Sequence, residues 1–144
     1  MSEFSRRNYF KKALLSAGSF LVMGKVAANT CSLTPTQTEG PFYPIQDQPD
    51  KDSDLTTVRG NSRRSEGEVV LLKGRVVNEE CRPIEGVMVE IWQACASGKY
   101  DHPNDPNPAR LDPNFQYWGR SVTNAQGEYA FKTIIPGHYP ATNS

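Results

Sequence analysis

The chain has 144 residues, which is room for one domain, and its 37% hydrophobic and 22% charged residues are ordinary for a globular protein. The formal charge is zero, but the first 28 residues hold five basic groups and one acid, so the remainder carries a net charge of −4. A mildly acidic body argues against nucleic-acid binding, which needs a basic face.

Residues 1–28 resemble an export signal of the twin-arginine class. The stretch SRRNYFKK places an arginine pair before aromatic residues and lysine, and the apolar run ALLSAGSFLVMG follows it. This run of 12 residues is shorter than the roughly 20 needed to span a bilayer. Val26 and Ala28 supply small residues at −3 and −1 for cleavage before Asn29. We expect a periplasmic or secreted mature chain without a membrane anchor; the alternative is an amphipathic N-terminal helix.

Residues 29–66 are rich in Pro, Thr, Gln, Asp and Ser and show little periodicity. We interpret them as an irregular arm laid over a domain formed by residues 67–144. The apolar, β-branched stretch EVVLLKGRVVN predicts the first strand of that domain, with Gly74 as a possible bulge.

The stretch VMVEIWQ alternates in a way typical of a second strand. Val87, Val89 and Ile91 would share one face, with Met88, Glu90 and Trp92 on the other.

The stretches GRSVT and GEYAFKTI flank NAQG, which predicts a hairpin turn ending at Gly127. No helical periodicity of useful length follows residue 28, so the fold class is all-β, an antiparallel β-sandwich. A sandwich usually needs about seven strands, and the sequence offers four or five. We therefore expect an incomplete sandwich, from a partial copy of a longer protein rather than from a sheet that another chain completes.

Residues 96–120 form a connection rich in Pro, Asp and Asn between two strand-like stretches. Connections longer than about 12–15 residues are uncommon unless they are functional or disordered. The stretch DHPNDPNPARLD lacks the residue order of an EF-hand, so we interpret it as a solvated acidic loop. Five other aromatic residues are interpreted as core or loop packing: Trp92, Phe115, Trp118, Tyr129 and Phe131.

Three cysteines leave the disulfide pairing partly open. Cys81 and Cys95 flank a seven-residue strand of roughly 23 Å, which argues against a bond between them. Cys31 could pair with either one. No CxxC pair is present, so a zinc or redox-dithiol site has no support.

Two blocks resemble the intradiol ring-cleavage dioxygenases, in particular the protocatechuate 3,4-dioxygenase type. They are TPTQTEGPFYP (34–44) and the stretch from LKGRVV to PGHYP (72–140). That family holds a mononuclear non-haem Fe(III) through two tyrosines and two histidines. By position the resemblance implies Tyr100 and Tyr139 as metal ligands. Ferric iron favours hard anionic oxygen, and phenol has an ordinary pKa near 10, so a multivalent cation is needed to keep it ionised at neutral pH.

The resemblance also implies a reaction: cleavage of a catechol-type, protocatechuate-like ring between its two hydroxyls by O2, giving a muconate-type diacid. Tyr139 would be the catalytic residue, leaving the metal and accepting a substrate proton, while Tyr100 stays bound. Thr38, Gly40 and Pro41 would line the substrate pocket. We also expect a homo- or hetero-oligomer of sandwich subunits, and a long loop that lifts Tyr100 toward the metal, stiffened by its prolines.

The two histidine ligands of the family would fall in a His-x-His element beyond Ser144, and neither His102 nor His138 stands at a ligand position. We therefore predict that the 144-residue polypeptide alone neither binds iron tightly nor turns over catechols. Transthyretin-like and carboxypeptidase-regulatory binding modules share the strand layout and form the alternative without catalysis. The long connection and the arm favour the enzyme family, whereas the particular catechol stays open.

Overall fold

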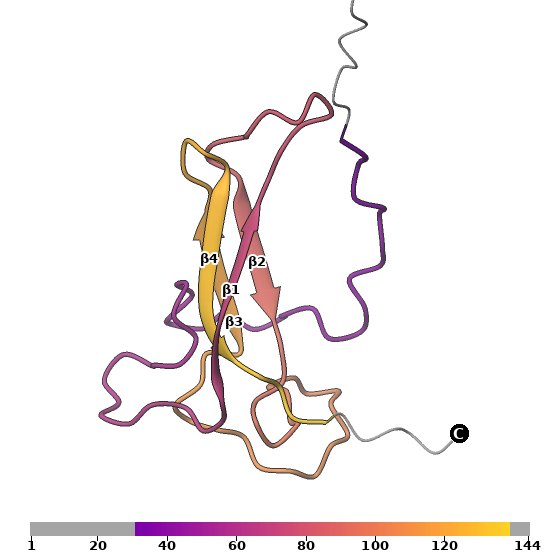
Figure 1. The fold of residues 1–144 in the computed structure, drawn as a ribbon. Coiled ribbons are helices and arrows are strands. Elements are labelled where there is room, and N and C mark those ends of the chain that lie inside the picture. The colour runs from indigo at the N-terminus through magenta and orange to yellow at the C-terminus, as the bar shows by residue number, and fades with distance from the viewer. Residues whose placement is uncertain (1–30, 139–144) are drawn as a thin grey trace, which may run out of the picture.

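The computed structural model describes residues 31–138 and contains four strands in that range. The strands are β1 (Val69–Arg75), β2 (Met88–Trp92), β3 (Trp118–Val122) and β4 (Glu128–Ile134). They form two antiparallel pairs, β1 with β4 and β2 with β3, and the described range has no helix. The expected all-β class and antiparallel pairing are confirmed. In Figure 1 the two pairs overlap, and the long connections gather at one end of the strands.

The core draws side chains from both sheets. Val89 and Ile91 of β2 pack against a cluster that includes Phe131 of β4, whose side chain is 1% exposed. Met88, on the opposite face of β2, is 56% exposed. The expected division of β2 into two faces is seen at Val89, Ile91 and Met88, whereas Trp92 of the second face also packs against the core cluster. All five aromatic residues expected to pack do so, being buried or packed against the same cluster.

The turn at Asn124–Gly127 forms as expected, but it does not join the two strands of a hairpin. The Asn124 carbonyl accepts the Gly127 N–H at 2.8 Å, and Gly127 has φ 71°. The strands on either side then separate, because β3 pairs with β2 and β4 pairs with β1. The hairpin prediction was wrong: the turn carries the chain from one sheet to the other.

Gly74 is not a bulge. It sits in regular register opposite Tyr129, within an unbroken β1–β4 ladder. A Cβ at Gly74 would collide with the Tyr129 ring, so the glycine leaves room for that ring to lie over the strand. The glycine marks a close side-chain approach, the second common reason for glycine in a strand.

Residues 52–55 of the N-terminal arm connect the two sheets. Leu55 N–H donates to the Lys132 carbonyl of β4 at 2.8 Å, and Arg120 N–H of β3 donates to the Asp52 carbonyl at 3.2 Å. Leu55 is fully buried, and it packs where Gly119 offers no side chain. This part of the arm is therefore built into the core.

A disulfide joins Cys31 to Cys81, and Cys95 is a buried free thiol. The absence of a Cys81–Cys95 bond is as expected, and the pairing left open by the sequence is resolved. The bond ties the start of the described arm to the β1–β2 connection. No helix in residues 31–138 is long and apolar enough to cross a membrane. The predicted signal at 1–28 lies outside the described residues.

Candidate active site

The connection between β2 and β3 is built around short polar side chains that bind its own backbone. The Asp105 carboxylate accepts the N–H groups of Tyr100 at 2.7 Å and Asn107 at 2.8 Å. Asn107 in turn accepts the Ala109 N–H at 3.0 Å. Asp105 and Asn107 are 6% and 7% exposed, so the prediction of a solvated acidic loop was wrong for these residues, although Asp101 is exposed as expected. The acids serve as internal acceptors, which fix the backbone on both sides of the turn.

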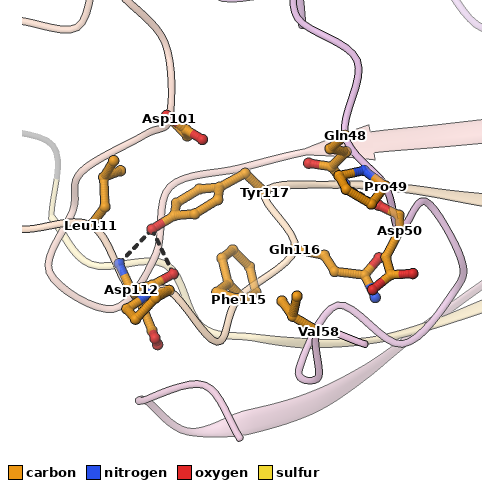
Figure 2. Close-up of a pocket in the computed structure, with 11 residues that line it drawn as sticks. Gln48, Pro49, Asp50, Val58, Asp101, Leu111, Asp112, Phe115, Gln116 and Tyr117 are labelled. Atoms are coloured by element: carbon orange, nitrogen blue, oxygen red, sulfur yellow. Dashed lines mark hydrogen bonds between the residues drawn. The ribbon is translucent and has the colours of Figure 1, made fainter. Parts of the chain in front are cut away.

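Tyr117 closes the far end of this connection. Its hydroxyl accepts the Asp112 N–H at 2.6 Å and donates to the Asp112 carbonyl at 3.2 Å (Figure 2). Its ring packs edge-on against Phe115, with centroids 5.1 Å apart. Burial raises the pKa of the Tyr117 hydroxyl far above the ordinary value for a phenol. Tyr117 therefore stays protonated and fixes the backbone at Asp112 through these hydrogen bonds.

Tyr100 lies in the same aromatic cluster and is 5% exposed. Its ring meets Tyr117 edge-on at 6.1 Å and lies nearly parallel to His102, with centroids 6.3 Å apart. Unlike Tyr117, the Tyr100 hydroxyl makes no hydrogen bond to any residue between 31 and 138. Burial, with a smaller contribution from the Asp101 carboxylate, raises the Tyr100 pKa to about 12. At neutral pH Tyr100 is therefore a protonated phenol, and a cation that binds its oxygen would have to displace this proton.

The arm reaches this cluster through two aromatic residues. Phe42 packs edge-on against His102 at 5.4 Å, and Tyr43 packs edge-on against Trp92 at 5.1 Å. The Tyr43 hydroxyl also donates to the Glu90 carboxylate at 3.3 Å. Phe42, two residues after Gly40, therefore contacts His102, whose ring lies next to Tyr100.

The three predicted pocket residues of the arm are Thr38, Gly40 and Pro41, and all are exposed. Gly40 has φ 80°, a left-handed conformation that favours glycine. The connection from these residues to Tyr100 runs through Phe42 and the His102 ring.

Tyr139, the other predicted ligand, lies outside the described residues. The chain that leads to it is described as far as His138. Gly137 N–H donates to the Cys95 carbonyl at 3.0 Å, and the His138 carbonyl lies directly against Gly98. Any side chain at Gly98 would collide with that carbonyl, so the glycine permits the close approach. Residues 137–138 therefore lie beside residues 95–98, which lead to Tyr100.

Two cavities flank the cluster. A cavity of about 490 Å³ is lined by Tyr117, by apolar residues and by the carboxylates of Asp50, Asp101 and Asp112 (Figure 2). A smaller one of about 70 Å³ is lined by Tyr100 and Trp118 and closed by residues 44–48 of the arm. Tyr100 lines the smaller cavity and not the larger one. A site at Tyr100 would therefore lie next to residues 44–48 of the arm.

Within residues 31–138, no group of three or more His, Cys, Asp and Glu side chains could hold a metal. Of the predicted ferric ligands, only Tyr100 falls in this range. The Tyr100 residue is 5% exposed, and a phenol oxygen suits a hard cation, so the ligand present fits the ion. The histidine ligands implied by the resemblance are not among these residues.

The comparisons with known proteins decide the family. A family model described as "Dioxygenase" matches residues 38–144. The beta chain of protocatechuate 3,4-dioxygenase from Burkholderia cepacia is 43% identical over 103 residues, which cover 72% of this chain. The chain belongs to the intradiol ring-cleavage dioxygenases. The predicted family is confirmed, and the arm from Thr38 onward falls within the match.

Solved structures agree with this intradiol dioxygenase assignment. An intradiol ring-cleavage dioxygenase from Tetranychus urticae has a TM-score of 0.57 and 33% identity, covering 76% of this chain and 54% of that one. The dioxygenase domain of a carbohydrate-binding fusion protein from Streptomyces sp. SirexAA-E has a TM-score of 0.54 and 31% identity, covering 76% and 60%. The chain spans 44% of the Burkholderia relative's length.

Sequence reasoning missed three elements of this dioxygenase chain. Tyr117 was not singled out, although its aromatic neighbours were. His102 was expected at the surface but is 7% exposed, in contact with Phe42 and Tyr100. The third is the set of internal carboxylate acceptors. The spacing of Asp and Asn two residues apart, as in Asp105 and Asn107, was a usable signal, because such side chains accept the N–H two residues on.

Proposed function

We propose that this chain forms part of a non-haem Fe(III) enzyme that opens a catechol-type ring between its two hydroxyls with O2, giving a muconate-type diacid. Membership of the intradiol family supports the reaction class. The observation that carries the proposal is the position of Tyr100, a tyrosine 5% exposed in an aromatic cluster, two residues after the Gly98 backbone against which the His138 carbonyl lies.

Tyr100 and Tyr139 are the proposed protein oxygens at the metal. When bound, Fe(III) would hold both substrate oxygens and favour their ionisation. Burial raises the Tyr100 pKa to about 12, so the side chain is a neutral phenol at neutral pH until a cation displaces its proton. Metal loading should therefore release a proton from Tyr100.

The two tyrosines would have different tasks. Tyr100 is held on a backbone fixed by the Asp105 carboxylate and against the Tyr117 ring, which suits a permanent ligand. Tyr139 is the proposed catalytic residue, whose phenolate oxygen accepts a proton from a substrate hydroxyl. Tyr139 would thus accept one of the two substrate protons, while Tyr100 would keep the cation in place.

The arm is proposed to cover the substrate. Thr38, Gly40 and Pro41 would line the ring pocket, as the resemblance implies. The contact of the next residue, Phe42, with His102 supports a place for this turn near Tyr100. The substrate class is protocatechuate-like, in keeping with the name of the Burkholderia relative.

The test is a ring-cleavage assay with the iron-loaded enzyme of which this chain forms part; the 144-residue polypeptide alone is expected to be inactive. Oxygen uptake should match catechol consumption one to one, with a muconate-type diacid as product. Tyr139→Phe should lower kcat at least 100-fold, since proton transfer by a positioned side chain contributes about 10²–10⁴-fold. Tyr100→Phe should also lower kcat, because it removes a metal ligand. A Tyr43→Phe variant, which changes a phenol on the other side of the arm, is the matched control. Intact catechols after incubation with wild-type protein at full iron occupancy would refute the proposal.

We also propose that the mature chain works outside the cytoplasm and as an oligomer of sandwich subunits. The Cys31–Cys81 disulfide supports export, because disulfides persist mainly in oxidising compartments. The name "beta chain" of the Burkholderia relative supports assembly with a second subunit. Replacing Arg6 and Arg7 by lysine should retain the protein in the cytoplasm. Unchanged export of that variant, detected by cell fractionation, would count against the twin-arginine route.

A further inference from the structure

His102 holds a buried hydrogen-bond donor that nothing in the described chain accepts. The Asn104 N–H donates to Nδ1 of the imidazole at 3.1 Å. The ring proton is therefore on Nε2, since a nitrogen that accepts a hydrogen bond does not carry the proton itself. Nε2 is sealed from solvent and has no hydrogen-bond partner. The residue is 7% exposed, so bulk solvent does not reach the ring.

Backbone hydrogen bonds hold the His102 main chain, and two aromatic rings lie next to its imidazole. The His102 N–H donates to the Tyr100 carbonyl at 2.9 Å, and the Asp105 N–H donates to the His102 carbonyl at 3.0 Å. Phe42 covers the ring from the arm and Tyr100 lies parallel to it. The imidazole is thus fixed at the junction of the arm and the loop.

An unsatisfied buried N–H is unfavourable. A phenylalanine would remove it and would release the Asn104 N–H, at an exposed residue, to solvent. The donor is thus suited to an acceptor that arrives with a ligand. The site lies beside Tyr100, where the proposed function brings a ring substrate with two hydroxyl oxygens. An ionised oxygen is the acceptor that gains most from a preorganised N–H in a water-excluded place.

We propose that His102 is a substrate-binding residue whose Nε2–H donates a hydrogen bond to an oxygen of the catechol-type ring bound next to Tyr100. This inference rests on the proposed function. His102 would then supply a hydrogen-bond donor to the substrate, at the place where Phe42 of the arm packs against the imidazole.

The test separates the donor from the ring that carries it. In His102→Phe the ring remains and the donor is lost, whereas in His102→Gln the amide nitrogen replaces Nε2. Both variants and the wild type are made as the complete enzyme of which this chain forms part. Thermal unfolding is measured without metal, and binding of 4-nitrocatechol to the iron-loaded protein is followed by its visible spectrum. His138→Gln, at an exposed histidine, is the matched control.

The expected result is opposite signs in the two measurements. His102→Phe should unfold at the same temperature as the wild type or higher, and should bind 4-nitrocatechol about tenfold more weakly, the loss typical of one hydrogen bond to an ionised oxygen. His102→Gln should recover part of that affinity. A lower unfolding temperature with unchanged affinity in His102→Phe would show that the ring only packs, and would overturn the inference alone. A wild-type protein that binds no catechol at full iron occupancy would overturn the proposed function together with it.

Discussion

Removing the disulfide should cost more stability than any other single change to the arm. The Cys31–Cys81 bond closes a loop of 50 residues in sequence. That loop contains the whole described arm and β1, and its other attachments include the β1–β4 ladder, the backbone bonds of residues 52–55 and the aromatic contacts of Phe42 and Tyr43. Without the bond the unfolded chain regains the freedom that this closure removes.

The size of the effect follows from loop closure. For a loop of this length the chain-entropy relation gives about 4 kcal/mol at 25 °C. At roughly 3 °C per kcal/mol for a chain of this size, the unfolding temperature should fall by about 12 °C. The variant Cys31→Ser/Cys81→Ser removes both thiols, so no unpaired cysteine is introduced.

Urea unfolding of wild type and variant, followed by tryptophan fluorescence, measures the difference directly. Reductant should destabilise the wild type by the same amount and leave the variant unchanged, since Cys95 is already a free thiol. A loss below about 1 kcal/mol would refute the reasoning, because it would mean that the arm is held in place by its other contacts alone.

Three further outcomes are expected. Gly74→Val should destabilise the protein by about 1–3 kcal/mol in urea unfolding, because its side chain would displace the Tyr129 ring; an unchanged midpoint would contradict the close approach. Asp105→Ala should cost about 2–3 kcal/mol, because the buried N–H groups of Tyr100 and Asn107 lose their acceptor, and faster amide exchange at both would show it. The metal-free protein should lose stability as pH rises from 10 toward 12, by about 1.4 kcal/mol per pH unit for Tyr100, because the folded state keeps the phenol proton more tightly than the unfolded state. Tyr100→Phe should reduce that slope, and an identical slope in the variant would contradict the burial of this phenol.

Local patterns in the sequence predicted the strands well. The alternation predicted that Val89 and Ile91 share one face of β2, and both pack against the core cluster. The pairing of strands was not readable in the same way. The turn ending at Gly127 has the residues of a hairpin, and only the packing of β3 and β4 into different sheets shows that it joins two layers.

The site was predicted in part, for a similar reason. The resemblance placed Tyr100 by position, and the structure adds what position does not give: burial, and contacts with Tyr117 and His102. Those contacts depend on a loop whose acids face inward. A count of charges in DHPNDPNPARLD indicates solvent exposure, whereas the acids are satisfied by backbone N–H groups close in sequence. Gly98 shows the same limit, since its role depends on the His138 carbonyl 40 residues later.

The central claim is that Tyr100 and Tyr139 bind one ferric ion. The visible spectrum of the iron-loaded enzyme of which this chain forms part tests it most directly. Phenolate bound to Fe(III) absorbs visible light, so the wild type should be coloured at one iron per chain. Tyr100→Phe and Tyr139→Phe should each weaken the band, and the double variant should lose it. A colourless wild type at full iron occupancy, or a band that both single variants keep unchanged, would contradict the account.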